Sequence, residues 1–194
     1  MTNAIETMMA EHRLIVRVLG GLHTLASRLR QGQPVPREDV ARFARFFREF
    51  ADRAHHAKEE DRLFGKLIES GFSPQYGPVA VMLAEHTAGR QHVRALAQAG
   101  EGCGPLTPDE TAQVIHHAEQ FVPLLMDHIR KEDHILYPMA QEALSAKQLA
   151  NLDAECDAFD RQIQDSGQLQ QLKDLAAELI RAYPADPARF GAAD

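Results

Sequence analysis

Two stretches decide the fold, because each repeats the other: HHAKEEDRLF at residues 55–64 and HIRKEDHILY at residues 128–137. Each begins with histidine, carries a Lys–Glu pair one turn later and ends in two apolar residues. A similar match precedes them, with MMAEH at 8–12 and MLAEH at 82–86. The intervals from His12 to His55 and from His86 to His128 differ by a single residue. The chain therefore contains two copies of one helical hairpin.

Apolar residues recur at helical spacing along the chain, and the alternation typical of strands is absent. The spacing predicts long helices over residues 3–30, 36–70, 78–100 and 107–143. Thr107, followed by Pro108 and two acidic residues, is typical of a helix N-terminus. We therefore expect an all-α protein. Four long helices joined by short loops predict an antiparallel up-down-up-down four-helix bundle.

The C-terminal part of the sequence predicts an addition to that bundle. We expect a four-helix bundle over residues 1–144 and a helical extension over residues 145–194. Two short apolar stripes predict one or two further helices, the first at Leu149, Leu152, Cys156 and Phe159 and the second at Leu172, Leu175, Ala176, Leu179 and Ile180. The pattern leaves open whether these helices cover the bundle or form a homodimer contact.

Composition and charge exclude several classes of function. The 194 residues carry a net charge of −7 and no long basic run, so neither nucleic acid nor an anionic membrane is an expected partner. No apolar run approaches the length of a membrane span, and the N-terminus does not resemble a signal peptide. Cys103 and Cys156 do not form a disulfide framework. We therefore expect a cytoplasmic protein.

The repeat also predicts a metal site. Histidine and glutamate four residues apart lie one turn apart on the same helix face. In the predicted bundle six side chains converge towards one end: His12, His55, Glu59, His86, His128 and Glu132. Residues four apart that share a helix face with His55 are mostly apolar, whereas those that share a face with His56 are mostly polar. We therefore expect His56 and Glu60 to be solvated. Burying the six without a metal would be costly, and the alternative is a cluster of His–Glu hydrogen bonds.

The residue types indicate which metal would bind. Imidazole and carboxylate ligands without cysteine favour iron or manganese, and zinc less. In helical bundles carboxylates from facing helices commonly bridge two irons. Two six-coordinate ions offer about twelve positions. Four histidines, two bridging glutamates and one oxo or hydroxo bridge would leave roughly two of these positions open for a small molecule.

Over residues 5–143 the chain resembles the hemerythrin-like HHE cation-binding domain, in the motifs HHAKEEDRLF, EHTAGR and HIRKEDHILYP. The resemblance implies a non-haem di-iron centre held by the six residues above. It also implies reactivity towards dioxygen, nitric oxide or peroxide, as a sensor or a redox catalyst. Glu11 and Glu85 are candidates for an additional ligand or for supporting roles.

Two positions depart from the oxygen-carrying relatives. Those proteins have a further histidine where this chain has Arg90, and an aspartate where it has Glu132. The difference disfavours a reversible oxygen carrier. Since a guanidinium cannot ligate a metal, we expect Arg90 at the edge of a pocket, paired with Glu11, Glu59 or Glu132.

Other functions remain open at this stage. One is a metal-responsive module that signals to a partner through residues 145–194, or an iron-handling protein without turnover. Another is a storage or structural bundle that holds zinc or another ion. A related family repairs iron–sulfur centres but carries an N-terminal cysteine-containing domain. The chain begins at the bundle, so we expect a different role. His23 and His117 are expected to reach the far end of the core, where they form a hydrogen-bonded pair, remain partly exposed or bind a second ion. His92, His116 and His134 are expected at the surface.

Overall fold

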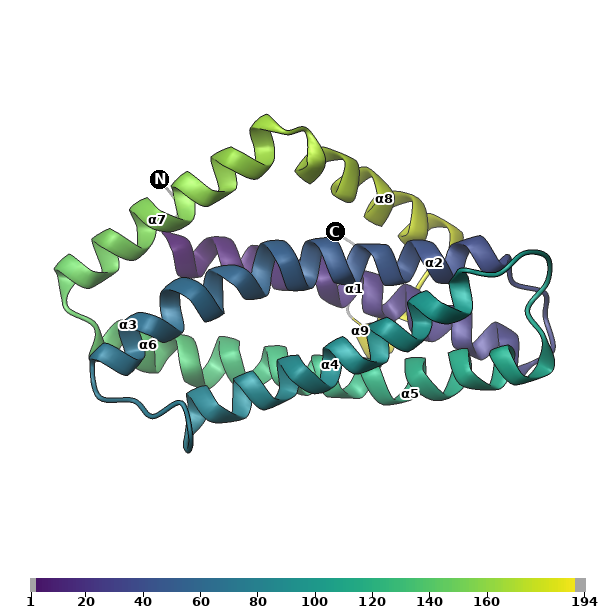
Figure 1. The fold of residues 1–194 in the computed structure, drawn as a ribbon, viewed down its shortest axis with the longest axis horizontal. Coiled ribbons are helices and arrows are strands. Elements are labelled where there is room, and N and C mark those ends of the chain that lie inside the picture. Colours follow the sequence, from purple (N-terminus) through teal and green to yellow (C-terminus); the bar gives the residue numbers. More distant parts are fainter. Residues whose placement is uncertain (1–2, 191–194) are drawn as a thin grey trace.

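The computed structural model describes residues 3–190, and every regular element in that range is a helix (Figure 1). The all-α class predicted from the sequence is therefore confirmed. The first long helix is α1 (Ala4–Arg30), and α4 (Pro78–Gly100) is the third. The second and fourth are composite. Their parts are α2 (Arg37–Phe46), η1 (Phe47–His56), η2 (Glu59–Leu63) and α3 (Phe64–Glu69), then α5 (Pro108–Lys131), η3 (Glu132–Leu136) and α6 (Tyr137–Ala143).

The helices begin where their capping residues stand. The side chains of Asn3 and Thr107 each accept a hydrogen bond from the backbone N–H three residues later. The side chains of Glu6 and Glu110 in turn accept one from the backbone N–H of the capping residue. Pro78 and Pro108 occupy the first helical positions, where a missing N–H costs nothing. The ends predicted for the four long helices agree with the structure to within one residue.

The segments η1, η2 and η3 are π-helical. Their hydrogen bonds join residues five apart, so a turn holds more residues than in an α-helix. Each segment contains or adjoins a residue of the repeated His–Glu motif. The wider turn brings more consecutive side chains onto the inner face of the helix, so neighbouring residues of the motif can both point inward.

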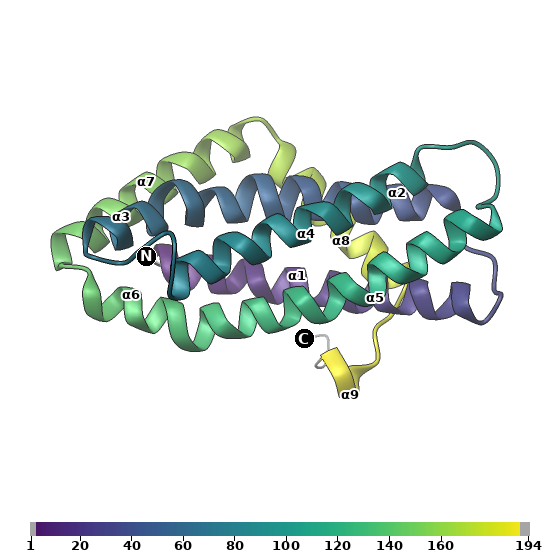
Figure 2. The same cartoon turned by 60° about the horizontal axis from the view of Figure 1, so that its bottom comes forward.

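The four long helices lie side by side, and successive helices are joined at alternate ends of the molecule (Figures 1 and 2). Helix α4 packs against both α2 and α5, and α1 packs against α5. The C-terminal helices α7 (Ala146–Asp165) and α8 (Gln168–Ala182) form an angled cover over α1 and the second helix (Figure 1). The short α9 (Pro187–Phe190) contacts α1.

Two apolar clusters make up the core, and a polar layer separates them. Along α1 the order is Met8 in one cluster, His12 in the layer and Ile15 in the other cluster. The order along the chain is the same on α4 and is reversed on the second and fourth long helices. The layer is therefore closed on both sides by apolar packing, and it lies where the repeated motifs meet.

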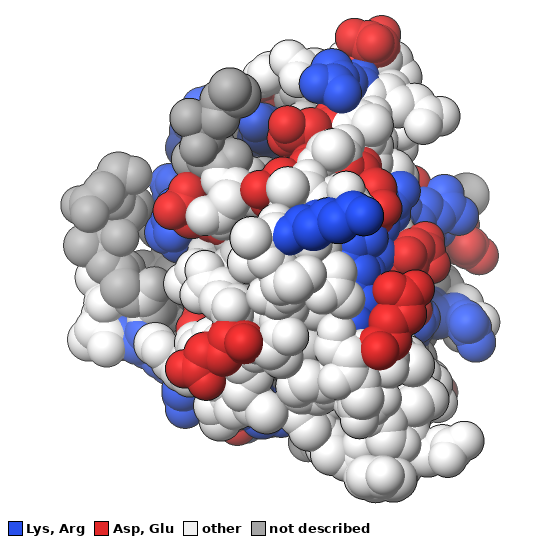
Figure 3. Space-filling view, turned by 90° about the vertical axis from the view of Figure 1, so that its left-hand side faces the viewer, with Lys and Arg blue, Asp and Glu red and all other residues white. Residues whose placement is uncertain are grey.

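The outer surface shows a weakly charged end. Figure 3 views the molecule from the side of α3 and α6, and most of the lower part of this face carries no charged side chain. Ile68, Tyr76 and Val81, in and around the loop between α3 and α4, are exposed. Among the described residues, no helix combines the length and the apolar character that crossing a membrane requires.

Candidate metal centre

The polar layer brings together all six predicted ligands. The six and His56 supply two groups of donor atoms, and within each group the atoms lie within 4.8 Å of one another. The first group contains His56, Glu59, His86 and His128, and the second contains His12, His55, Glu59 and Glu132. Glu59 belongs to both. Every one of these side chains is buried.

The four predicted histidines are oriented by carboxylates outside the layer. Each Nδ1 lies 2.6–2.9 Å from a carboxylate oxygen: His12 from Asp133, His55 from Glu11, His86 from Glu60 and His128 from Glu85. Because an ionised carboxylate only accepts hydrogen bonds, the ring donates from Nδ1. The lone pair then resides on Nε2, which faces the interior of the layer. Carboxylate-bound histidines of this kind are typical metal ligands.

The supporting contacts follow the sequence repeat. Glu11 binds Lys58 as well as His55, and Glu85 binds Lys131 as well as His128. Both oxygens of each glutamate thus contact a histidine Nδ1 or a lysine, and neither glutamate belongs to the two groups of donor atoms. Glu11 and Glu85, left open by the sequence as extra ligands, lie in supporting positions.

The inner carboxylates lack hydrogen-bond partners where a metal would bind. Within the described residues, both oxygens of Glu132, Oε2 of Glu59 and Nε2 of His55 are buried and unpartnered. Glu132 Oε2 lies 3.1 Å from His128 Nε2 and 3.3 Å from His12 Nε2. Leaving such acceptors buried costs about 1–3 kcal/mol each. A bound cation would satisfy all of them, so the residues present fit a metal centre.

In the metal-free chain, raised pKa values keep protons on several side chains of the polar layer. Burial lowers the pKa of His12, but the hydrogen bond with Asp133 and the negative charges of Glu132 and Glu59 nearby outweigh this effect and raise the pKa to about 10. The pKa of His86 is raised in the same way, to about 9. Burial and the nearby Glu132 raise the pKa of Glu59 to about 8. Metal binding must therefore release protons.

The expectation that His56 and Glu60 are solvated is wrong. His56 is 7% exposed, and its ring stacks on that of His86 with 3.8 Å between centroids. Glu60 is partly buried and accepts the hydrogen bond from His86 Nδ1. The α-helical rows of the sequence misplaced both residues, because the π-helical turns η1 and η2 bring positions 55 and 56, and then 59 and 60, to the inner side together.

Arg90 lies at the edge of a cavity, but its partners differ from those expected. Its guanidinium binds Asp52, with Nε 2.8 Å from Oδ1, and Glu60, with Nη2 2.7 Å from Oε1. The pairing predicted with Glu11, Glu59 or Glu132 is therefore wrong. Those three carboxylates are occupied by or directed towards the inner histidines, whereas Asp52 and Glu60 line the side from which Arg90 approaches.

The two halves of the centre differ at two positions of the repeat. His56 corresponds to Ile129, so only the first half carries a second inner histidine. Phe64 corresponds to Tyr137, whose hydroxyl donates to Glu59 Oε1 at 2.6 Å. The two donor groups are therefore chemically distinct, which the near-symmetry of the motifs did not indicate.

A buried lysine links the centre to the C-terminal extension. Lys58 is fully buried and binds Asp160 of α7, with Nζ 2.9 Å from Oδ1, as well as Glu11. Its counterpart Lys131 is partly exposed. The sequence indicated no role for either residue: Lys58 is part of the repeated Lys–Glu pair, but nothing local shows that it is buried, and Asp160 has the pattern of an ordinary surface charge.

His23 and His117 lie outside the polar layer and do not pair with each other. His117 Nδ1 lies 3.1 Å from Nδ1 of His92, and Arg189 donates to Nε2 of His23 at 2.8 Å. His23 and His117 therefore have separate partners. Of the alternatives that the sequence left open, a mutual pair is not formed, and both side chains are partly exposed.

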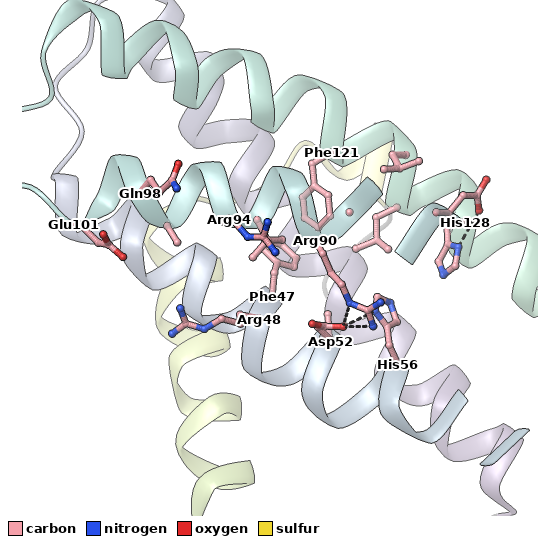
Figure 4. Close-up of a pocket in the computed structure, with 17 residues that line it drawn as sticks. Phe47, Arg48, Asp52, His56, Arg90, Arg94, Gln98, Glu101, Phe121 and His128 are labelled. Carbon is pink, nitrogen blue, oxygen red and sulfur yellow. Dashed lines mark hydrogen bonds and ion pairs between the residues drawn. The ribbon is translucent and has the colours of Figure 1, made fainter. Parts of the chain in front are cut away.

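A cavity of about 380 Å³ opens beside the centre (Figure 4). It lies between η1, α4 and α5 and reaches His56 and His128 at one end. Arg90 and Asp52 lie close to His56, and Gln98 and Glu101 mark the opposite end. The centre thus has an approach from the surface.

Comparison with known proteins agrees with this geometry. Residues 3–140 match the family described as the Hemerythrin HHE cation binding domain. The chain belongs to this family.

Among curated proteins, the chain is similar to the iron-sulfur cluster repair protein YtfE of Yersinia pseudotuberculosis serotype IB (strain PB1/+). The two are 36% identical over 92 residues, which is 44% of this chain. The chain spans about 40% of the length of that relative. No solved structure gives a significant match.

Proposed function

We propose that the chain is a non-haem di-iron protein that reacts with a small ligand, namely dioxygen, nitric oxide or peroxide, as a sensor or a redox catalyst. The ligands are His12, His55, Glu59, His86, His128 and Glu132. One observation carries the proposal: four carboxylate-bound histidines direct Nε2 towards two glutamates whose inner oxygens have no partner among the described residues. Manganese or zinc fits the same side chains less well.

The surrounding fold supports this arrangement. We propose that the four long helices form the antiparallel up-down-up-down bundle expected from the sequence, with residues 145–194 as a cover. The alternating directions of successive helices in Figures 1 and 2 and the packing of α4 against α2 and α5 support it. Opposite directions bring the ligands of all four helices to one level.

Bound iron would supply one-electron redox steps and open coordination positions. The chain's own residues hold the geometry. Glu11 and Glu85 keep His55 and His128 in one tautomer, and the Tyr137 hydroxyl restrains Glu59. A small ligand reaches the layer through the cavity at His56. The apolar clusters on either side exclude bulk water.

Iron loading under reducing conditions tests the proposal. We expect two irons per chain by metal analysis and, after oxidation, charge-transfer bands in the near ultraviolet. Consumption of hydrogen peroxide or nitric oxide would assign a catalytic role, whereas binding without consumption would assign a sensor. A colourless protein that retains one zinc ion would contradict the di-iron function.

A second candidate is an iron-handling or metal-responsive role without turnover. Two observations favour it: the similarity to a relative named for iron-sulfur cluster repair, and the chain of contacts from His55 through Glu11 and Lys58 to Asp160 on α7. Proteolysis of α7 with and without iron distinguishes the two. Protection of α7 that depends on iron, together with the absence of turnover, would favour this role.

A further inference from the structure

The cavity beside the centre is larger than a diatomic molecule or hydrogen peroxide requires. Its volume of about 380 Å³ falls within the range of pockets that hold small organic molecules. It follows α4 from Arg90 to Gln98, and eight residues of helix span about 12 Å. The shape therefore suits an elongated molecule.

The cavity wall is apolar along its middle. Phe47 and Phe121 meet edge to face with 5.0 Å between ring centroids, and Val93 and Leu125 complete the floor. Gly89 leaves room there, since a Cβ at that position would already touch the Phe121 ring at 3.4 Å. This part of the cavity favours a hydrocarbon or aromatic body.

The charges on the cavity leave a cationic edge. Asp52 is neutralised by Arg90, and Glu85 by Lys131 and His128. Arg48 contacts Glu49 through Nε, and the ion pairs of residues 3–190 include none for the exposed Arg94. Glu101 lies at the far end (Figure 4). Arg48 and Arg94 are thus available to an anionic group.

The inner end of the cavity carries a polar atom without a partner. Nδ1 of His56 is buried and accepts or donates no hydrogen bond within the described part of the chain, although Asp52 Oδ1 lies 3.5 Å away. Burying such an atom is costly unless a ligand group meets it.

We propose that this cavity binds an organic anion with two polar ends: a carboxylate held by Arg48 and Arg94, an elongated apolar body over Phe47 and Phe121, and an oxygen group facing His56. A medium-chain carboxylate oxygenated at its far end has this chemistry. The inference deepens the proposed function and rests on it, because it names a ligand class that would place its oxygen group beside the metal centre.

Calorimetric titration of the metal-free full chain tests the proposal with 10-hydroxydecanoate, decanoate and acetate. We expect one 10-hydroxydecanoate per chain, weaker binding of decanoate and none of acetate. Arg94→Gln should weaken both long ligands about tenfold, the loss expected for one charge-assisted hydrogen bond. His56→Phe should remove the advantage of the hydroxyl group. Equal affinity of both long ligands for the unmodified chain would overturn the role of His56.

Two tryptophan variants on α4 provide the matched control. Ala97→Trp fills the cavity, whereas Gln91→Trp stands on the exposed side of the same helix. With helicity and melting temperature unchanged, we expect loss of binding in Ala97→Trp alone. Binding that survives Ala97→Trp would place the ligand elsewhere and overturn the proposal. Iron uptake is measured separately, so failure of the iron function and failure of this inference give different results.

Discussion

At the scale of single residues, the unpartnered oxygens of Glu59 and Glu132 define the centre. Both side chains are fully buried and lie between histidines from different helices. A carboxylate in this position can bridge two cations, because it has one oxygen for each. The loss of either carboxylate should therefore affect both metal positions.

We predict that Glu59→Ala lowers iron binding from two ions to one or fewer per chain, because Glu59 belongs to both groups of donors. Metal analysis after gel filtration measures it. Glu69→Ala, which removes an exposed carboxylate from the same composite helix, should retain two ions. Full loading of the Glu59 variant would exclude a bridging role.

Arg90 acts on the centre through Glu60, which orients His86. We predict that Arg90→Gln weakens iron binding about tenfold, the lower end of the range for residues that support metal ligands. A competition titration with a chelator measures the change. Arg94→Gln, one turn further along α4, is the control and should leave iron affinity unaltered; equal losses in the two variants would refute the role given to Arg90.

At the scale of elements, helix α7 contacts the bundle at two places, the start of α1 and the buried Lys58 beside the polar layer. Asp153 accepts a hydrogen bond from the Ala4 backbone N–H at 2.8 Å, and Asp160 binds the buried Lys58. The extension therefore stabilises the start of α1 and the Glu11–His55 contact together.

We predict that Asp160→Asn destabilises the protein by about 1–3 kcal/mol, because it removes a negative charge that faces the buried Lys58 ammonium group. It should also weaken the iron position that includes His55. Denaturant unfolding and iron titration measure the two effects. The control is Glu155→Gln, which neutralises the partner of Lys66 on the same helix near the surface and should change neither stability nor iron binding. Equal effects of the two variants would show that the Lys58–Asp160 contact does not support the centre.

The sequence predicted the long helices well, because capping residues and apolar periodicity are local signals. The positions of His56 and Glu60 could not be predicted, because π-helical turns depend on packing around the polar layer. The contact between Lys58 and Asp160 joins residues 102 apart, and no local pattern encodes it. The six candidate ligands were accessible to sequence reasoning only because the chain repeats itself.

At the scale of the whole molecule, stability should depend on pH and metal together. In the metal-free chain the pKa of His12 is raised from 6.5 to about 10 and that of Glu59 from 4.5 to about 8. The native state then binds more protons than the unfolded state above neutral pH, so stability is lost as pH rises through these values. Burial lowers the pKa of His55 and His56, so those residues destabilise the chain below pH 6.5.

We therefore predict a maximum of metal-free stability near pH 6.5 and a fall in melting temperature of about 5 °C by pH 9.5, equivalent to one or two kcal/mol for a chain of this size. Iron loading should remove most of the alkaline fall, since iron replaces the protons. Thermal unfolding across pH, with and without iron, measures this. A metal-free chain that is more stable at pH 9.5 than at 6.5 would contradict the charge state assigned to the layer.

The duplication organises the whole molecule around one asymmetric centre, in which two similar hairpins meet but only one supplies His56 and only the other supplies Tyr137. Anomalous diffraction at the iron edge from crystals of the iron-loaded protein tests this claim most directly. We predict two peaks, one between His86 and His128 and one between His12 and His55, with Glu59 between them. A single peak, or peaks outside the polar layer, would contradict the account.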